Sequence, residues 1–216
     1  MSDGDLNGRG RVPVIGVFAL QGDVAEHACV LAALGARVVP VRAAADLGGL
    51  DGLVIPGGES SVMDKLSRLL GVAPAVREAI ASGLPVYGTC AGMIMLADSI
   101  ANPIGGQQSF GGLDVTVQRN AFGSQVDSFE TALEVPGVSG EPVHAVFIRA
   151  PAVLRSGGEV QVLASVPASR LESGRPAETG PVPVAVRQGN LLATSFHPEV
   201  TGDWSFHRYF LERLVR

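Results

Sequence analysis

The chain has 216 residues, of which 46% are hydrophobic and 17% charged, so one sizeable core is available and an intrinsically disordered chain is excluded. Its net charge is −5 and no basic stripe stands out, which excludes the usual electrostatic footprint of a nucleic-acid-binding protein. The high content of glycine and proline suits an α/β domain with many tight loops.

The N-terminal segment, residues 1–11, is polar and lacks the apolar stretch of a signal peptide, so we expect an N-terminal extension. The apolar run Val12–Leu20 predicts a buried first strand and is too short to cross a bilayer. Apolar residues at helical spacing predict a helix over Asp23–Leu34, with Gly35 at its end. We expect a single domain over residues 12–216, no membrane segment and a cytoplasmic location.

Strand and helix patterns alternate through the rest of the first hundred residues. Ser61, with Asp64 three residues later, resembles a capping box that opens a helix toward Leu70. The other elements expected in this half are strands at Ala36–Val41, Leu53–Ile55 and Pro85–Tyr87 and helices at Ala75–Ala81 and Ala91–Ala97. This alternation is typical of the α/β class, with a doubly wound, mainly parallel sheet flanked by helices.

The second half changes character, because strand-like segments follow one another with turn residues between them. They predict added antiparallel strands and one closing helix. The expected strands are Val115–Arg119, Ser128–Leu133, His144–Ile148, Gln161–Val166, Val182–Arg187 and Leu191–Ser195, and the helix is Trp204–Leu214. Residues 167–183 are rich in Pro, Gly and Ser and predict an exposed loop.

The segment Gly88–Gly92 (GTCAG), between a predicted strand and helix, has the G-x-nucleophile-x-G form of a nucleophile elbow. Its glycines allow a sharp turn that would lift Cys90 above the sheet edge. A position at a helix N-terminus favours the thiolate, and the N–H of Ala91 could stabilise an oxyanion. The alternative is a buried structural cysteine. With Cys29 the chain has two cysteines, too few for a disulfide framework.

A nucleophile needs a base, and only His197 has a carboxylate at a suggestive spacing. In an extended segment residues i and i+2 project to the same side, so Glu199 could reach one ring nitrogen and leave the other for Cys90. The remaining histidines are His27 and His207, which lie on predicted helices and are interpreted as surface or packing residues, and His144, which opens a strand.

The segment Pro56–Ser60 (PGGES) follows the third strand and should lie at the carboxyl end of the sheet, where such folds hold their sites. Its glycines would let the backbone approach a ligand closely, so we expect the second oxyanion donor there. An ordinary Gly-rich turn is the alternative. A phosphate loop is excluded because no G-x-x-x-x-G-K-[ST] occurs, and no cluster of His, Cys and Asp has metal-ligand spacing.

Taken together, the elbow and His197–Glu199 (HPE) resemble the class I (triad) glutamine amidotransferases. Further segments narrow the resemblance to the PdxT/SNO family, the glutaminase subunits of pyridoxal 5′-phosphate synthase. These segments are Ala19–Asp23 (ALQGD), Pro56–Ser61, Arg119–Gln125 (RNAFGSQ) and Phe147–Pro151 (FIRAP). The resemblance runs from about Val14 to the C-terminus, and the extension at 1–11 and an insertion at Ser169–Pro181 depart from it.

The resemblance implies a class I glutamine amidotransferase-like fold in which Cys90 attacks the side-chain amide of L-glutamine. His197, held by Glu199, would protonate the departing ammonia. The oxyanion donors would be Gly58 and Ala91, and the substrate contacts would come from Gly57, Gly58, Glu59, Arg119, Ile148 and Arg149. No cofactor and no metal is implied. The ammonia would pass to the lyase subunit of pyridoxal 5′-phosphate synthase in a hetero-oligomeric complex.

Gln21 should lie at the same sheet edge as the Gly57–Gly58 peptide, and we expect it to help relay docking of the partner to this loop. The alternative is that Gln21 merely caps the end of its strand. Other functions also stay open at this point. They are a glutaminase subunit of another pathway such as histidine or purine synthesis, a non-catalytic regulatory domain of the same fold, and a cysteine peptidase that acts alone.

Overall fold

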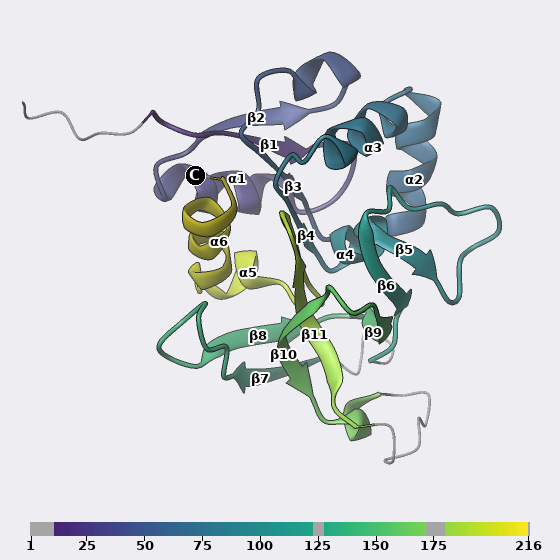
Figure 1. Ribbon diagram of the computed structural model, residues 1–216, viewed down its shortest axis with the longest axis vertical. Coiled ribbons are helices and arrows are strands. Elements are labelled where there is room, and N and C mark those ends of the chain that lie inside the picture. Colours follow the sequence, from purple (N-terminus) through teal and green to yellow (C-terminus); the bar gives the residue numbers. More distant parts are fainter. Residues whose placement is uncertain (1–10, 123–127, 172–179, 216) are drawn as a thin grey trace, which may run out of the picture.

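The computed structural model describes residues 11–122, 128–171 and 180–215. A seven-stranded sheet in the order β10-β11-β12-β4-β3-β1-β2 forms its centre (Figure 1). The strands from β12 to β2 are parallel to one another, whereas β10 and β11 are antiparallel additions. The strand bounds are β1 Val14–Phe18, β2 Arg37–Val41, β3 Gly52–Ile55, β4 Val86–Thr89, β10 Gln161–Val166, β11 Val182–Gln188 and β12 Leu191–Thr194. The predicted α/β class, mainly parallel with later antiparallel strands, is confirmed.

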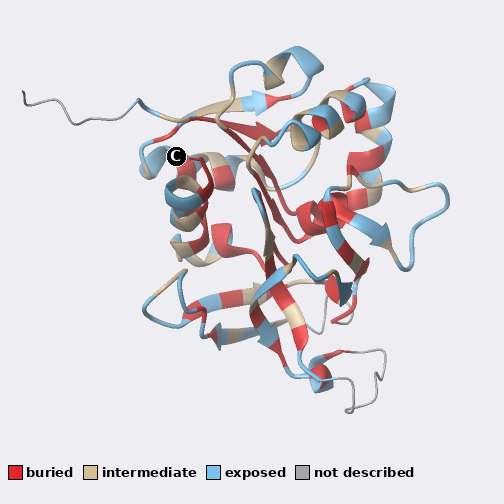
Figure 2. Cartoon of the chain, viewed as in Figure 1, coloured by how far each residue is buried: buried red, intermediate tan, exposed pale blue. Residues whose placement is uncertain are grey.

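Helices cover both faces of this sheet, because its parallel strands are apolar on both sides. In β3, Val54 packs into the core on the side of α1 and α6, while Leu53 and Ile55 pack into the core under α2, α3 and α4. Figure 2 shows the resulting buried strands between helices that are exposed on their outer sides. The helix bounds are α1 Val24–Ala33, α2 Ser60–Leu69, α3 Ala73–Ala81, α4 Ala91–Leu96, α5 Pro198–Thr201 and α6 Ser205–Phe210, with short 3₁₀ turns at Ala44–Leu47 and Ala168–Arg170.

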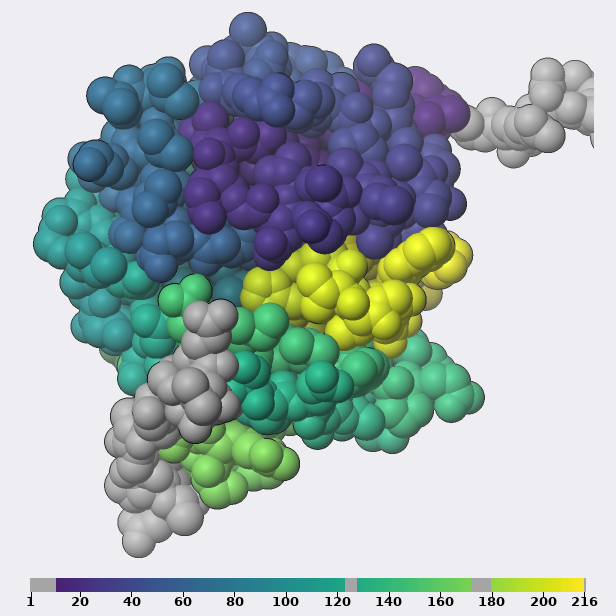
Figure 3. Space-filling view, turned by 180° about the vertical axis from the view of Figure 1, so that it is seen from behind, coloured from purple at the N-terminus to yellow at the C-terminus, as the bar shows by residue number. Residues whose placement is uncertain are grey.

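Two small sheets extend the two cores. A three-stranded sheet packs on the side of α4, and a two-stranded antiparallel sheet packs on the side of α6. From behind, the C-terminal helices lie between the N-terminal part of the chain and the β7–β8 region (Figure 3). The bounds are β5 Ala97–Ile100, β6 Leu113–Gln118 and β9 Ala152–Ser156 in the first sheet and β7 Phe129–Leu133 and β8 Val143–Phe147 in the second.

The structure corrects several predicted elements. Strands β5 and β9 were not predicted, and the helix expected to end at Ala97 ends at Leu96 because Ala97 is extended and begins β5. The closing helix is α-helical only to Phe210 and continues as a π-helical turn over Leu211–Val215.

The start of α2 also differs from the prediction. The N-cap is Glu59, whose carboxylate accepts hydrogen bonds from the N–H and hydroxyl of Ser61. The predicted capping box of Ser61 and Asp64 is therefore wrong, since the Asp64 carboxylate is buried and bound to Arg68 instead.

Some predictions fall wholly or partly outside the described residues. These are most of the N-terminal extension (1–10), the end of the Arg119–Gln125 segment (123–125) and part of the predicted loop (172–179). Among the residues that the structure does describe, no helix is long and apolar enough to cross a membrane.

The sheet order brings four loops to one edge. Strands β1, β3, β4 and β12 are parallel neighbours, so their carboxyl ends point the same way. Strand β12 comes from the end of the chain and pairs with β4 so that Thr194 stands opposite Thr89. The residue after Thr89 is Cys90, and His197 follows β12 by three residues. Ligand sites of open α/β sheets lie at such an edge.

Candidate active site

Cys90 occupies a sharp turn between β4 and α4. Its φ of 47° and ψ of −103° lie outside the usual region for a side-chain-bearing residue. Such a conformation costs on the order of 1–3 kcal/mol and persists only when its surroundings enforce it. The N–H of Cys90 donates to the carbonyl of Thr194 at 2.8 Å, and its carbonyl accepts from Met93 at 3.1 Å. A Cβ at Gly92 would lie 2.1 Å from the carbonyl oxygen of Ile55, so only glycine lets the turn pack this closely on β3.

His197 is held beside this turn by contacts of its backbone and its ring. Its N–H donates to the carbonyl of Val146 in β8 at 3.1 Å. Its Nδ1 lies 2.7 Å from Oε1 of Glu199. The predicted contact is present, but the extended segment assumed for it is wrong. His197 is the N-cap of α5, which begins at Pro198, so Glu199 lies in the first helical turn.

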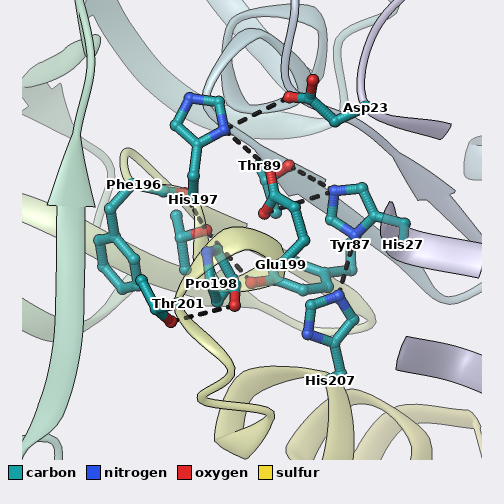
Figure 4. Close-up of polar contacts among 11 residues, drawn as sticks. Asp23, His27, Tyr87, Thr89, Phe196, His197, Pro198, Glu199, Thr201 and His207 are labelled. Atoms are coloured by element: carbon teal, nitrogen blue, oxygen red, sulfur yellow. Dashed lines mark hydrogen bonds and ion pairs between the residues drawn. The ribbon is translucent and has the colours of Figure 1, made fainter. Parts of the chain in front are cut away.

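The surroundings of His197 favour a charged ring. Burial lowers the pKa of His197, but Asp23, Cys90 and Glu199 outweigh it and raise that pKa to about 12. Asp23 Oδ2 lies 3.5 Å from Nδ1, on the same side as Glu199 (Figure 4). Since Nδ1 faces the two carboxylates, Nε2 is the ring nitrogen left for Cys90. A cationic imidazole in this position can supply a proton to a leaving group.

The same three side chains are the one group of possible metal ligands within the described part of the chain: Asp23, His197 and Glu199. A metal would have to take Nδ1 of His197, the nitrogen that faces both carboxylates. Metal ligation needs a neutral imidazole, and the raised pKa of His197 keeps the ring protonated. The arrangement therefore suits an ion pair better than a metal centre.

A pocket of about 300 Å³ opens beside Cys90 and gathers most of the predicted site. It is lined by nine of the predicted residues: Gln21, Gly58, Glu59, Cys90, Ala91, Arg119, Ile148, Arg149 and His197. The other two, Gly57 and Glu199, do not line it. Glu199 is buried behind the ring of His197, and Gly57 directly precedes Gly58. The pocket thus contains both cationic and anionic side chains next to the predicted nucleophile.

The loop after β3 has a defined orientation in this structure. The carbonyl of Gly57 accepts a hydrogen bond from the N–H of Asp23 at 3.1 Å. Because the peptide is planar and trans, the N–H of Gly58 points away from Asp23. Gly58 has a φ of 148°, and a Cβ there would lie 2.3 Å from Oε1 of Gln21. The loop therefore requires glycine at this position and packs directly against Gln21.

Different features distinguish the two predicted arginines: an ion pair for Arg119 and an unusual backbone conformation for Arg149. Arg119 is buried, and its guanidinium donates to Oε1 of Glu59 at 2.9 Å, which makes an ion pair inside the pocket. The main chain of Arg119 is fixed by Asn102, which accepts from its N–H and donates to its carbonyl. Arg149 follows β8 with a φ of 45°, a left-handed conformation rare for residues with side chains.

Comparison with known proteins decides the family. A family model described as the SNO glutamine amidotransferase family matches residues 17–216. The chain belongs to this family. It is 60% identical over 200 residues to pyridoxal 5′-phosphate synthase subunit PdxT of Clavibacter michiganensis, covering 93% of this chain and 90% of that protein. The PdxT subunit of Leifsonia xyli is 59% identical over 202 residues, covering 94% of this chain and 96% of that one.

Solved structures share the fold of this SNO-family chain. A crystal structure of a glutamine amidotransferase has a TM-score of 0.80 and 46% identity, over 93% of this chain and 98% of that one. PurLQS from Thermotoga maritima has a TM-score of 0.56 at 15% identity, over 95% and 92% of the two chains, and shares the fold.

Sequence reasoning did not assign a site role to Asp23, which lines the pocket and contacts His197, and it also missed two histidines near the site of this SNO-family chain. His27 in α1 and His207 in α6 were interpreted as surface or packing residues; both are fully buried, which excludes a surface position. Both belong to a polar cluster behind Glu199 (Figure 4). The available signal was their place on apolar helix faces, since His27 precedes Val30 and Leu31, and His207 precedes Phe210 and Leu211, by three and four residues.

Proposed function

We propose that this chain is the glutaminase subunit of a pyridoxal 5′-phosphate synthase. It hydrolyses L-glutamine to L-glutamate and ammonia and delivers the ammonia to a lyase subunit for vitamin B6 synthesis. The observation that carries this proposal is the contact of His197 with Glu199 beside Cys90 in a chain 60% identical to PdxT over 93% of its length. The enzyme works as one domain over residues 12–216, in the cytoplasm, with no cofactor of its own.

In the first half-reaction, Sγ of Cys90 attacks the amide carbon of glutamine and a C–S bond forms. The negative charge that develops on the amide oxygen is stabilised by the N–H groups of Ala91 and Gly58. His197 donates the proton from Nε2 to the amide nitrogen, the C–N bond breaks, and ammonia leaves. Glu199 keeps the ring in the orientation that this transfer needs.

In the second half-reaction, water hydrolyses the thioester. The neutral ring of His197 takes a proton from the attacking water, the new C–O bond forms, and the C–S bond breaks. The thiolate of Cys90 leaves, His197 is again protonated, and the new carboxylic acid loses its proton to solvent as L-glutamate is released. Atoms and charge balance over the cycle without any metal or redox partner.

The charged end of glutamine fits the charges of the pocket. Free glutamine carries an ammonium and a carboxylate group on its α-carbon. Glu59 supplies an anion for the ammonium, and the guanidinium forks of Arg119 and Arg149 suit the carboxylate. Ile148 and the Gly57–Gly58 backbone complete the contacts. The ion pair between Arg119 and Glu59 holds both groups in place at the pocket.

The deciding experiment measures ammonia release from L-glutamine by the chain alone, by the chain with a pyridoxal 5′-phosphate synthase lyase subunit, and by Cys90→Ala with that subunit. We expect ammonia release to rise with the lyase subunit, and pyridoxal 5′-phosphate to form from a pentose phosphate and a triose phosphate with glutamine as nitrogen source. Activation instead by a synthase of histidine or purine formation would support the alternative pathway. Absence of glutamine hydrolysis under all conditions would support a non-catalytic domain.

A further inference from the structure

We propose that His27 and His207 are positioning residues that orient Glu199 through a directed chain of hydrogen bonds, His207 to His27 to Glu199. The inference concerns the buried side of the site, opposite the pocket. Its effect on turnover rests on the proposed glutaminase function. The direction of the hydrogen bonds, that is, which group donates to which, can be tested without that function.

The geometry begins at the two helices that carry the histidines. His27 Nδ1 lies 2.8 Å from His207 Nε2, and both side chains are fully buried. The other nitrogen of His27, Nε2, lies 3.0 Å from the hydroxyl oxygen of Thr89 and 3.5 Å from Oε2 of Glu199. The chain of contacts therefore runs from α6 through α1 to the residue that binds His197 (Figure 4).

Both histidines are neutral in this environment. Burial lowers the pKa of His27 well below its usual value, and the nearby His207 and His197 lower it further. Burial also lowers the pKa of His207, to about 4, although Asp203 opposes part of the effect. A hydrogen bond between two neutral imidazoles requires an N–H on one ring and a lone pair on the other. Two opposite arrangements are therefore available.

In the first arrangement His27 donates from Nδ1 to His207. Its Nε2 then carries a lone pair that faces the carboxylate of Glu199, and the two repel each other. His207 would carry its proton on Nδ1, an atom buried without a hydrogen-bond partner among the described residues. Glu199 Oε2 would also stay buried with no donor in that part of the chain. Three unfavourable features thus coincide.

In the second arrangement His207 donates from Nε2 to His27, and His27 presents its Nε2–H to Thr89 and Glu199. The carboxylate oxygen that has no closer donor among the described residues now faces an N–H group. Of the three side chains His27, His207 and Glu199, the atom then left without a partner among the described residues is Nδ1 of His207, which carries a lone pair. This arrangement is the better one, because it pairs the carboxylate with a donor and leaves neither imidazole with an unpaired N–H.

The consequence is that each oxygen of the Glu199 carboxylate faces its own donor. Oε1 accepts from His197, and Oε2 is directed toward His27, so the carboxylate cannot rotate freely. A fixed carboxylate fixes the ring of His197 and hence the direction of its Nε2. His27 touches neither glutamine nor Cys90 in this scheme and acts through Glu199 alone.

A matched pair of substitutions at His27 separates this role from simple packing. In His27→Gln the amide nitrogen can occupy the position of Nε2, whereas in His27→Asn it reaches only the position of Nδ1. With the lyase subunit present, we expect His27→Gln to keep kcat within about threefold of the parent and His27→Asn to lower kcat about tenfold or more, with KM for glutamine unchanged in both. Full kcat for a folded His27→Asn would overturn the proposal.

A spectroscopic test does not depend on activity or on the stability of any variant. In ¹⁵N-histidine-labelled parent protein, the nitrogen shifts of His27 and His207 report which ring nitrogen carries the proton. We expect the proton on Nε2 in both residues at neutral pH. A proton on Nδ1 of His27 would overturn the proposal whatever the kinetics. Protons on both Nε2 atoms in a chain that never hydrolyses glutamine would support the hydrogen-bond order and reject the proposed function.

Discussion

The side-chain oxygen of Gln21 accepts a hydrogen bond from the main-chain N–H of Glu59 at 2.7 Å. This contact ties the loop after β1 to the loop after β3. Gln21 does not simply cap the end of β1, because its oxygen is bound to another loop. A change at Gln21 would therefore act first on the Gly58–Glu59 peptide, which directly follows the Gly57–Gly58 peptide that supplies the proposed second oxyanion donor.

We predict that glutamine hydrolysis depends on docking of the partner through this contact. A misplaced oxyanion donor costs about 2.7–4 kcal/mol, so the isolated chain should be about 10²–10³-fold slower than its complex with the lyase subunit. Gln21→Ala should reduce the gain on docking. Steady-state ammonia release by the three samples measures this. Equal rates with and without the partner would refute the dependence on docking. A fully active Gln21→Ala complex would show that Gln21 does not take part in it.

We predict that the two cysteines react differently. Cys29 is exposed and Cys90 is buried at the pocket. A general alkylating agent should therefore modify Cys29 readily, whereas a glutamine-analogue alkylator should modify Cys90 alone. Peptide mass spectrometry identifies the labelled residue. Cys90→Ala should abolish glutaminase activity, on the order of 10⁴-fold or more, while Cys29→Ala leaves it unchanged. Labelling of Cys29 by the analogue would contradict the assignment of the nucleophile.

We predict unequal effects at the base and its partner. His197→Asn removes the group that transfers the proton, so kcat should fall about 10²–10⁴-fold. Glu199→Gln retains one oxygen that can accept from Nδ1 but loses the charge and the second acceptor oxygen, and it leaves the proton-transferring ring in place, so a smaller loss is expected. Single-turnover thioester formation in the complex compares the two. If Glu199→Gln proved more damaging than His197→Asn, the order of roles would be reversed.

We predict that Arg149 governs substrate affinity. A hydrogen bond to a charged group contributes about 1.5–3 kcal/mol, so Arg149→Ala should raise KM about 10–100-fold with a modest change in kcat. Arg37 lies at an exposed position of strand β2, so Arg37→Ala is the matched control and should change neither parameter. A crystal structure with bound glutamine in which Arg119 and Arg149 both point to solvent would rule this out.

We predict an acid-sensitive contribution of His207 to stability. The pKa of His207 is lowered by burial to about 4, against 6.5 for a free imidazole. Between these values the unfolded chain binds more protons, so the free energy of unfolding falls as pH decreases. From pH 7 to pH 5 this group alone should cost about 2 kcal/mol. His207→Gln keeps the donor to His27 but cannot titrate. Urea unfolding at the two pH values should show a smaller loss for this variant, and equal losses would contradict the prediction.

The local parts of the site could be predicted from the sequence. The elbow around Cys90 is a pentapeptide between a strand and a helix, and Glu199 stands two residues from His197. Short spacings of this kind restrict geometry before tertiary packing is known. Even there the backbone differed from the expectation, because a helix begins directly after His197 and the segment to Glu199 is not extended.

The buried polar cluster could not be predicted in the same way. His27 and His207 are 180 residues apart in the chain and meet only because α1 and α6 cover the same face of the sheet. A lone histidine on an apolar helix face is compatible with packing alone. Strands β5 and β9 were missed for a similar reason, since both pair with β6 and gain their regular structure from that pairing.

Because β12 must pair with β4, the active site can assemble only late in the synthesis of the chain. Strand β4, which directly precedes Cys90, leaves the ribosome about a hundred residues before its neighbour β12, whose Thr194 stands opposite Thr89. At translation rates of about 5–20 residues per second, the β4 edge waits roughly 5–20 seconds for that neighbour. During this interval the nascent chain has a cysteine turn without the carbonyl of Thr194 that anchors it and without His197. We therefore expect chains that terminate before His197 to hydrolyse no glutamine.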